Sequence, residues 1–131
     1  DELNQLKGLW TDYESVFGRK KYAFDVTGAY YSNRLAFCEY LEKIKRQASC
    51  IVLREIRPEY YAPLGVGILR EASRDAFSKK PEIFPELKSV FNSINTRIKI
   101  NVSNFLRHSK LLASFRKQKR LNEFFNLQKN I

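Results

Sequence analysis

The chain has 131 residues, 44% of them hydrophobic and 14% aromatic, and its formal net charge is +10 at pH 7. This composition excludes a chain that is disordered over most of its length, and the length suffices for one domain with its own apolar core. No apolar run approaches the roughly 18 residues of a membrane-spanning helix, and no signal peptide is recognisable, so we expect a cytoplasmic protein. Because the chain starts at Asp1 and contains no methionine, we expect a fragment of a longer protein, whose missing N-terminal part would be one of its partners.

Helical and extended patterns alternate in the first part of the chain. Up to a break near Gly18, apolar residues recur every three or four positions and predict an amphipathic helix: Leu3, Leu6, Leu9, Trp10, Tyr13, Val16 and Phe17. Residues 22–27 alternate as in a short strand, and Gly28 ends that pattern. Residues 29–47 predict a long helix with four residues along its inner face: Tyr31, Leu35, Cys38 and Leu41.

The middle of the chain continues this alternation. Residues 49–56 have the branched apolar run of a buried strand, and residues 58–67, with two prolines and two glycines, predict a constrained loop. Helical patterns cover residues 68–77 and 81–94, and residues 97–100 are a candidate third strand. The inner face of the second of these helices is predicted to carry Ile83, Leu87, Val90 and Phe91.

The last predicted element is a helix that Ser103 is expected to cap. Its apolar residues are Phe105, Leu111, Leu112 and Phe115. Together the elements predict an α+β fold, a small helix-dominated domain with two or three short strands, followed by a C-terminal tail. We place the domain at residues 1–115 and the tail at residues 116–131.

The residues that most often hold metals are scarce. Cys38 and Cys50, the only cysteines, are too few for a disulfide framework or for a zinc site, which needs four ligands. Buried, reduced thiols are the expected state, and we predict neither a metal nor a cofactor. His108, the only histidine, follows Arg107 on a basic helix and is expected to lie on the surface.

Positive charge concentrates between Arg97 and Arg120, where eight basic residues occur without an acidic one. Such clustering predicts attraction to phosphate or to an acidic protein surface, and a solvated helix face is the alternative. In residues 53–77, Arg–Glu pairs flank a proline-stiffened loop with two tyrosines. Arginines beside tyrosines can hold phosphates and unstacked bases, whereas an Arg–Glu network that fixes the loop would be purely structural. The candidate DNA- or phosphate-binding residues are Arg54, Arg57, Arg70, Arg74, Tyr60, Tyr61, Arg107, Lys110, Arg116 and Lys117.

Short motifs in residues 28–77 are specific as a set: Gly28-Ala29-Tyr30-Tyr31, Arg34-Leu35-Ala36, Glu39-Tyr40-Leu41, Arg46-Gln47-Ala48, Arg54-Glu55, Tyr60-Tyr61, Pro63-Leu64-Gly65-Val66 and Arg70-Glu71. With Ser109-Lys110-Leu111-Leu112, this set resembles the C-terminal part of the archaeal Nre family. The resemblance covers roughly residues 28–125 and implies a DNA-repair protein that binds the replication sliding clamp, PCNA. One departure is Gly67, where the family pattern has a tryptophan, and the zinc finger of some members would lie upstream.

The C-terminal residues Gln118, Leu121, Phe124 and Phe125 resemble the clamp-interacting box, glutamine-x-x-aliphatic-x-x-aromatic-aromatic, at each defined position. In a three-residue helical turn Gln118, Leu121 and Phe124 line one side and Phe125 is adjacent. The resemblance implies that the aliphatic and aromatic side chains fill an apolar pocket of the clamp while the glutamine amide forms a hydrogen bond beside it. On an unbroken final helix Leu121, Phe124 and Phe125 would point about 150° away from the apolar face of residues 105–115. We therefore predict a plug for the clamp, with a helix break that folds it back onto the domain as the alternative.

Two other functions stay open beside a binding and repair module. A nucleic-acid-processing enzyme would use Arg54, Glu55, Arg70 and Glu71, with the two carboxylates as acid and base. Each glutamate neighbours an arginine, which lowers its pKa and favours a fixed ion pair instead. A purely structural interaction domain, bound to its N-terminal part, is the third interpretation.

Overall fold

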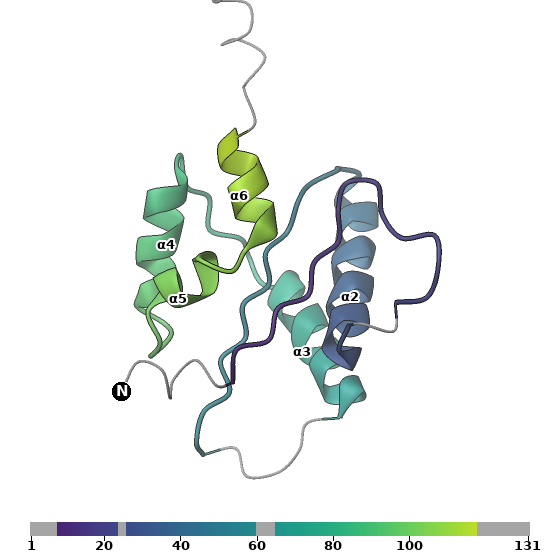
Figure 1. Ribbon diagram of the computed structural model, residues 1–131, viewed down its shortest axis with the longest axis horizontal. Coiled ribbons are helices and arrows are strands. Elements are labelled where there is room, and N and C mark those ends of the chain that lie inside the picture. Colours follow the sequence, from purple (N-terminus) through teal and green to yellow (C-terminus); the bar gives the residue numbers. More distant parts are fainter. Residues whose placement is uncertain (1–7, 24–25, 60–64, 118–131) are drawn as a thin grey trace, which may run out of the picture.

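The computed structural model describes residues 8–23, 26–59 and 65–117, and within them the chain is helical (Figure 1). Five α-helices follow one another: α2 (Gly28–Ile44), α3 (Val66–Ser78), α4 (Leu87–Asn95), α5 (Val102–Leu106) and α6 (Lys110–Lys117). Helices α2 and α3 pack against each other, and α4, α5 and α6 form a second group beyond the extended segments. No helix in the described part is long and apolar enough to cross a membrane.

The predicted α+β fold is wrong, because the described residues form no strand. Residues 49–56 are extended but unpaired, and residues 97–100 turn and bend beside them. The backbone N–H groups of Lys99 and Ile100 donate to the carboxylate of Glu55, at 2.9 and 2.7 Å, where a sheet would offer carbonyls of a neighbouring strand. Branched apolar residues favour extended chain, but a sheet also needs a partner in register, which no local pattern specifies.

Helices α2 and α3 run parallel. A Cβ atom on Gly28 would lie 2.9 Å from Val66 Cγ2 at their first turns, and the Ser73 hydroxyl donates to Asn33 Oδ1, at 2.6 Å, farther along. Near their last turns the ring of Phe77 stacks on that of Tyr40, with centroids 5.0 Å apart. Both helices were predicted, and their existence is confirmed.

The face of α2 that α3 covers is lined by small residues. Ser32 and Ala36 are 3% and 2% exposed, and Gly28 precedes them by one turn. A spacing of four residues forms one ridge of a helix, so three small side chains in this row allow the two backbones to approach closely. The predicted inner face is therefore wrong in phase, since Leu35 and Cys38 are exposed.

The segment before α2 is not the predicted amphipathic helix, because residues 9–18 form none. The N–H of Gly18 donates to the carbonyl of Ser15, at 2.9 Å, and closes a turn with Val16 and Phe17 at its centre. Gly18 has a φ of +66°, which glycine adopts without the steric cost of a side chain. Val16 and Phe17 are 93% and 91% exposed, so the apolar spacing here does not mark a buried face. The start of that predicted helix, residues 1–7, lies outside the described part.

The candidate strand at residues 22–27 is also wrong for the residues described there. The N–H of Ala23 donates to the hydroxyl of Tyr31 on α2, at 2.7 Å, instead of to a strand carbonyl. A side chain thus satisfies the backbone group that a sheet would have used. The segment is thereby held against α2.

Two side-chain caps divide the predicted final helix. Asn101 Oδ1 accepts the N–H of Ser103, at 2.9 Å, at the start of α5, and Ser109 Oγ accepts the N–H of Leu112, at 3.2 Å, at the start of α6. Ser103 is therefore a helix residue and not the cap that was expected. Because the chain turns between α5 and α6, residues 105–115 form no single helical face, and the predicted direction of the terminal box loses its premise.

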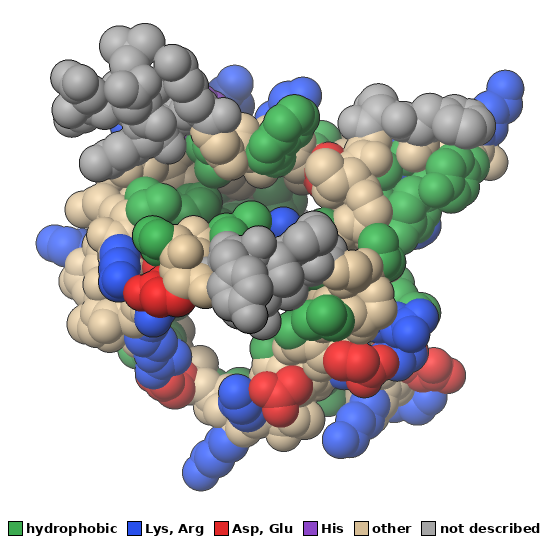
Figure 2. Space-filling view, turned by 90° about the horizontal axis from the view of Figure 1, so that it is seen from below, with side chains coloured by type: hydrophobic (Ala, Val, Ile, Leu, Met, Phe, Trp, Pro, Cys, Tyr) green, Lys and Arg blue, Asp and Glu red, His purple; other side chains and the backbone are tan. Residues whose placement is uncertain are grey.

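Few apolar side chains are buried, which corrects the expectation of a self-contained core for the described residues. The buried apolar residues are Ala23, Ala36, Val102 and Leu112. Helix α4 begins at Leu87 and not at Pro81, and Ile83 of the predicted inner face is 90% exposed. Figure 2 shows hydrophobic side chains at the surface among charged ones. Polar contacts join helices beside the apolar packing, as the hydrogen bond from Ser73 to Asn33 does between α3 and α2.

Candidate nucleic-acid interface

Arg74 on α3 joins the two parallel helices through carboxylates. Its Nε and Nη2 donate to the two carboxylate oxygens of Glu39 on α2, at 2.9 and 2.7 Å, and its Nη1 donates to Glu71 at 2.9 Å. The hydrogen bond from Arg74 holds the pKa of Glu39 below its ordinary value. Arg70 Nε lies 3.5 Å from the carboxylate of Glu71. This surface arrangement has the form of the Arg–Glu network, and phosphate binding by Arg70 and Arg74 stays a prediction.

Glu55 belongs to a second cluster, on the segment that follows α2. Its side chain is 7% exposed and lies 3.5 Å from Arg57 Nε, while Arg57 Nη2 donates to the carbonyl of Arg97, at 3.3 Å. The backbone N–H of Ile100, followed by that of Lys99 and by Arg57, holds the pKa of Glu55 below its ordinary value. Glu55 is therefore an ionised group tied to the backbone.

The two glutamates of the enzyme hypothesis thus have different partners. Glu55 is bound by backbone N–H groups and by Arg57, whereas Glu71 is bound by Arg70 and Arg74. An acid–base pair needs two carboxyl groups that share a site and differ in pKa. The contacts of Glu55 and Glu71 show two structural ion-pair clusters instead.

The basic stretch from Arg97 onward is partly neutralised by residues from elsewhere in the chain. Arg97 pairs with Glu82, and Lys99 Nζ lies 3.6 Å from a carboxylate oxygen of Glu59. The absence of acidic residues along this stretch of sequence is therefore not an absence of acidic neighbours in space.

The remaining predicted cations are exposed. Arg107 Nη2 donates to Asn104 Oδ1, at 2.5 Å, and Lys110 Nζ lies 5.9 Å from the ring centroid of Tyr13. Arg54, Arg116 and Lys117 are exposed as well. Predicted site residues that lie outside the described part are Tyr60, Tyr61, Gln118, Leu121, Phe124 and Phe125.

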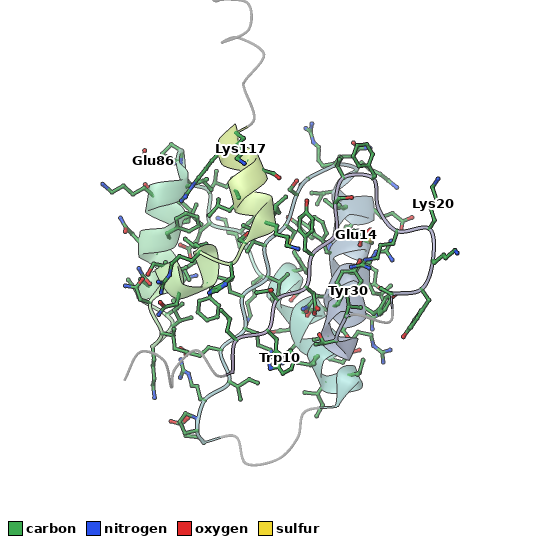
Figure 3. The ribbon with its side chains drawn as sticks, viewed as in Figure 1. Trp10, Glu14, Lys20, Tyr30, Glu86 and Lys117 are labelled. Atoms are coloured by element: carbon green, nitrogen blue, oxygen red, sulfur yellow. The ribbon has the colours of Figure 1, made fainter. Side chains whose placement is uncertain are left out.

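A cluster that the sequence patterns did not indicate joins the N-terminal segment to α2. We call it the tyrosine cluster: Glu14, Arg19, Tyr22, Tyr30, Tyr31 and Arg34. The hydroxyl of Tyr30 donates to Glu14, and Arg34 Nε lies 3.2 Å from the same carboxylate. Figure 3 shows Glu14 and Tyr30 close together beside α2. Burial, followed by the bond to Glu14, raises the pKa of Tyr30.

Ring contacts complete the tyrosine cluster. The guanidinium carbon of Arg19 lies 5.4 Å from the centroid of the Tyr30 ring. The rings of Tyr22 and Tyr31 stack, with centroids 5.0 Å apart and an interplanar angle of 11°. The sequence feature that accompanies this cluster is the run of three cations at residues 19–21, which lies between the predicted helix and the predicted strand.

The thiols and the histidine differ in exposure. Cys38 is exposed, contrary to the expected buried thiol, whereas Cys50 is half-buried and its burial raises the pKa of its thiol. His108 is exposed, as predicted. Within the described ranges, no group of three or more His, Cys, Asp or Glu side chains is placed to hold a metal ion.

Comparison with known proteins finds one family and several relatives. A family model described as archaeal Nre, C-terminal, matches residues 14–124. DNA repair protein NreB of Archaeoglobus fulgidus is 39% identical over 117 residues, which cover 89% of this chain and 29% of that protein. DNA repair protein NreA of the same organism is 36% identical over 105 residues, 74% of this chain and 27% of that protein. NreA of Haloferax volcanii is 29% identical over 105 residues, 80% of this chain and 25% of that protein. The chain thus spans about a quarter of the length of these relatives, and no solved structure matches it.

Proposed function

Because the chain belongs to the archaeal Nre family, whose C-terminal model matches residues 14–124, we propose that it is a DNA-repair module recruited to the replication sliding clamp. The role in repair is supported by the names of its relatives, which are DNA repair proteins. The observation that carries recruitment to the clamp is the box of Gln118, Leu121, Phe124 and Phe125. In this proposal residues 1–115 are the domain and residues 116–131 the tail that binds the clamp.

The position of the box supports its role as a plug. It follows directly on α6, which ends at Lys117 and is anchored by the buried side chain of Leu112. The exposed Arg116 and Lys117 precede the box and favour approach to an acidic rim. Burial of one aliphatic and two aromatic side chains supplies about 5–9 kcal/mol before ordering costs. A micromolar affinity, about −8 kcal/mol, is therefore the expected scale.

Contact with DNA is the second part of the proposal. Exposed cations on and near α6 offer phosphate contacts, namely Arg107, Lys110, Arg116 and Lys117, with Arg54 on the segment after α2. A clamp that already encircles DNA raises the effective concentration of that DNA near the module. Phosphate contacts that are weak in isolation then suffice for a productive complex.

The test of recruitment is calorimetric titration of the chain into the sliding clamp of its own organism. Replacement of both Phe124 and Phe125 with alanine is expected to abolish detectable binding, because it removes the aromatic part of the plug. Phe115→Ala is the matched control, since it removes a half-exposed phenylalanine of α6 ahead of the box. It should leave the affinity within about twofold. Equal affinities for the unaltered chain and the double variant reject the assignment of the box.

A nucleic-acid-processing enzyme that uses Arg54, Glu55, Arg70 and Glu71 remains the alternative hypothesis. The described geometry does not favour it, because Glu55 and Glu71 are held in separate ion pairs. Incubation of the chain with branched or damaged DNA, with and without a divalent metal, distinguishes the two functions. Turnover that disappears in Glu71→Gln favours the enzyme.

A further inference from the structure

The turn at residues 15–18 presents two apolar side chains to solvent and is followed by three cations. Val16 and Phe17 occupy the centre of this hydrogen-bonded turn and are almost fully exposed. Arg19, Lys20 and Lys21 come next in the chain. In Figure 3 Lys20 lies at the outer edge of the segment and points away from α2. Single exposed apolar side chains are common, whereas neighbouring ones that form a patch mark a contact site.

Arg19 belongs to the tyrosine cluster, whereas Lys20 and Lys21 take part in no ion pair within the described residues. Residues 15–23 contain no acidic residue. The two carboxylates just before them are engaged: Glu14 is bound within the tyrosine cluster, and Asp12 accepts the hydroxyl of Thr27, at 2.6 Å. A surface with this excess of charge attracts a polyanion.

Aromatic residues precede and follow these cations in the sequence, as Phe17 and Tyr22. The ring of Tyr22 stacks on Tyr31 through one face, and the residue remains 67% exposed. We propose that residues 16–22 bind single-stranded DNA, with unpaired bases stacked on Phe17 and Tyr22 and with Lys20 and Lys21 on the phosphates. This inference rests on the proposed function, because it names the form of DNA that the module holds near the clamp.

The aromatic rings decide between single-stranded and duplex DNA. Bases inside a duplex are covered by their neighbours, so a protein side chain stacks readily only on an unpaired base. Phosphates, by contrast, are available in both forms. The tyrosine cluster supports stacking because Tyr31 holds the Tyr22 ring in place, so less ring motion is lost on binding.

A protein partner fits this surface less well than DNA. Lysines are depleted in protein–protein interfaces, and burial of consecutive cations requires paired acidic groups on the partner. An exposed phenylalanine by itself fits either partner. The cations immediately after it favour the nucleic acid.

Fluorescence anisotropy of the whole 131-residue chain, with labelled oligo-dT and with a duplex of the same length, tests the proposal. Phe17→Ala combined with Tyr22→Ala is expected to weaken oligo-dT binding about tenfold or more, because two stacking platforms are lost. Duplex binding should stay within about twofold, since the phosphate contacts remain. Lys20→Ala combined with Lys21→Ala should weaken binding to both DNA forms. It should also reduce the slope of log affinity against log salt for oligo-dT by about 1.4, or about 0.7 per phosphate contact.

Matched variants separate these effects from general ones. Ile83→Ala removes a similarly exposed apolar side chain, and Lys80→Ala with Lys88→Ala removes two exposed charges far along the sequence from the turn. Circular dichroism verifies that each variant keeps its helices. The proposal is overturned if a control variant loses as much oligo-dT affinity as its test variant. It is also overturned if the Phe17 and Tyr22 variant loses affinity for oligo-dT and duplex DNA equally, or if the unaltered chain does not bind oligo-dT.

Calorimetry with the clamp keeps this inference apart from the proposed function. The Phe17 and Tyr22 variant should retain the clamp affinity of the unaltered chain. The Phe124 and Phe125 variant should in turn retain its oligo-dT affinity. If the unaltered chain binds oligo-dT but not the clamp, only the proposed recruitment is contradicted. If it binds the clamp but not oligo-dT, only the proposed DNA site at residues 16–22 is contradicted.

Discussion

Replacement of Gly28 with alanine tests how closely α2 packs on α3. The added Cβ would lie 2.9 Å from Val66 Cγ2, whereas carbon atoms in favourable contact are about 3.5–4.0 Å apart. Val66 is β-branched and lies in a helix, where one rotamer is strongly preferred, so rotation of its side chain offers little relief. The first turns of the two helices must therefore move apart by about half an ångström or more.

The cost of this change is the balance of two effects. Overpacking of a contact by an added methyl group costs about 1–3 kcal/mol. Alanine also restricts the unfolded chain more than glycine does, which offsets about 0.4–1 kcal/mol of that cost. We expect a net loss of about 1–2 kcal/mol in the free energy of unfolding, and a Tm about 3–8 °C lower for a chain of this size.

Thermal unfolding followed by circular dichroism measures the difference, with Gly67→Ala as the matched control. A Cβ on Gly67, also in the first turn of α3, meets no heavy atom within 4 Å, so alanine there should raise Tm. Val66→Ala in the Gly28→Ala background should restore part of the lost stability, since it removes the overlapping methyl group. A Tm for Gly28→Ala equal to or above that of the unaltered chain refutes the close approach of the two helices.

Three further changes concern a cap, the carboxylates and the thiols. Ser109→Ala removes the acceptor for the Leu112 N–H and should cost about 1 kcal/mol, so an unchanged urea midpoint contradicts the cap. The pKa of Glu39 and that of Glu55 are held below their ordinary value, so the ionised carboxylates stabilise the fold above that value and lose this contribution as the pH falls through their folded pKa. Urea midpoints should therefore drop between about pH 5 and about pH 3, and the drop should be smaller in Glu55→Gln. Exposed Cys38 should react with iodoacetamide faster than half-buried Cys50, whose raised pKa lowers its thiolate fraction, and mass spectrometry of the alkylated peptides measures both rates.

Periodicity located the helices of the parallel pair but not the face that α2 buries. The pattern at residues 29–47 predicted α2, but the helix ends at Ile44 because Lys45 adopts a left-handed φ of +53°. Helices commonly end in this conformation at glycine, so a lysine gives no sequence signal for the end of the helix. Its buried face follows Ser32 and Ala36 because a close helix contact selects small side chains. The spacing of apolar residues instead favoured the row that contains Leu35 and Cys38, which are exposed.

The strand predictions failed for a different reason, which is that pairing depends on distant residues. Residues 49–56 have the right local preference, yet the N–H groups of Lys99 and Ile100 are taken by the carboxylate of Glu55. A single side chain supplies the acceptor that a neighbouring strand would have provided, and the periodicity of a sequence does not indicate such a contact. The caps Asn101 and Ser109 could have been found, because both residue types are favoured at helix N-termini.

Charge counted along the sequence differs from charge in space, and the difference decides where a polyanion can bind. The stretch from Arg97 contains no acidic residue, yet Arg97 and Lys99 pair with Glu82 and Glu59, which lie earlier in the chain. Three arginines of the central region, Arg57, Arg70 and Arg74, likewise lie beside carboxylates. A phosphate must displace such a carboxylate before it gains an arginine, so these residues bind DNA less favourably than their number suggests. Within the described residues Lys20 and Lys21 take part in no such ion pair, so the DNA contact that we propose for residues 16–22 requires no carboxylate to be displaced from them.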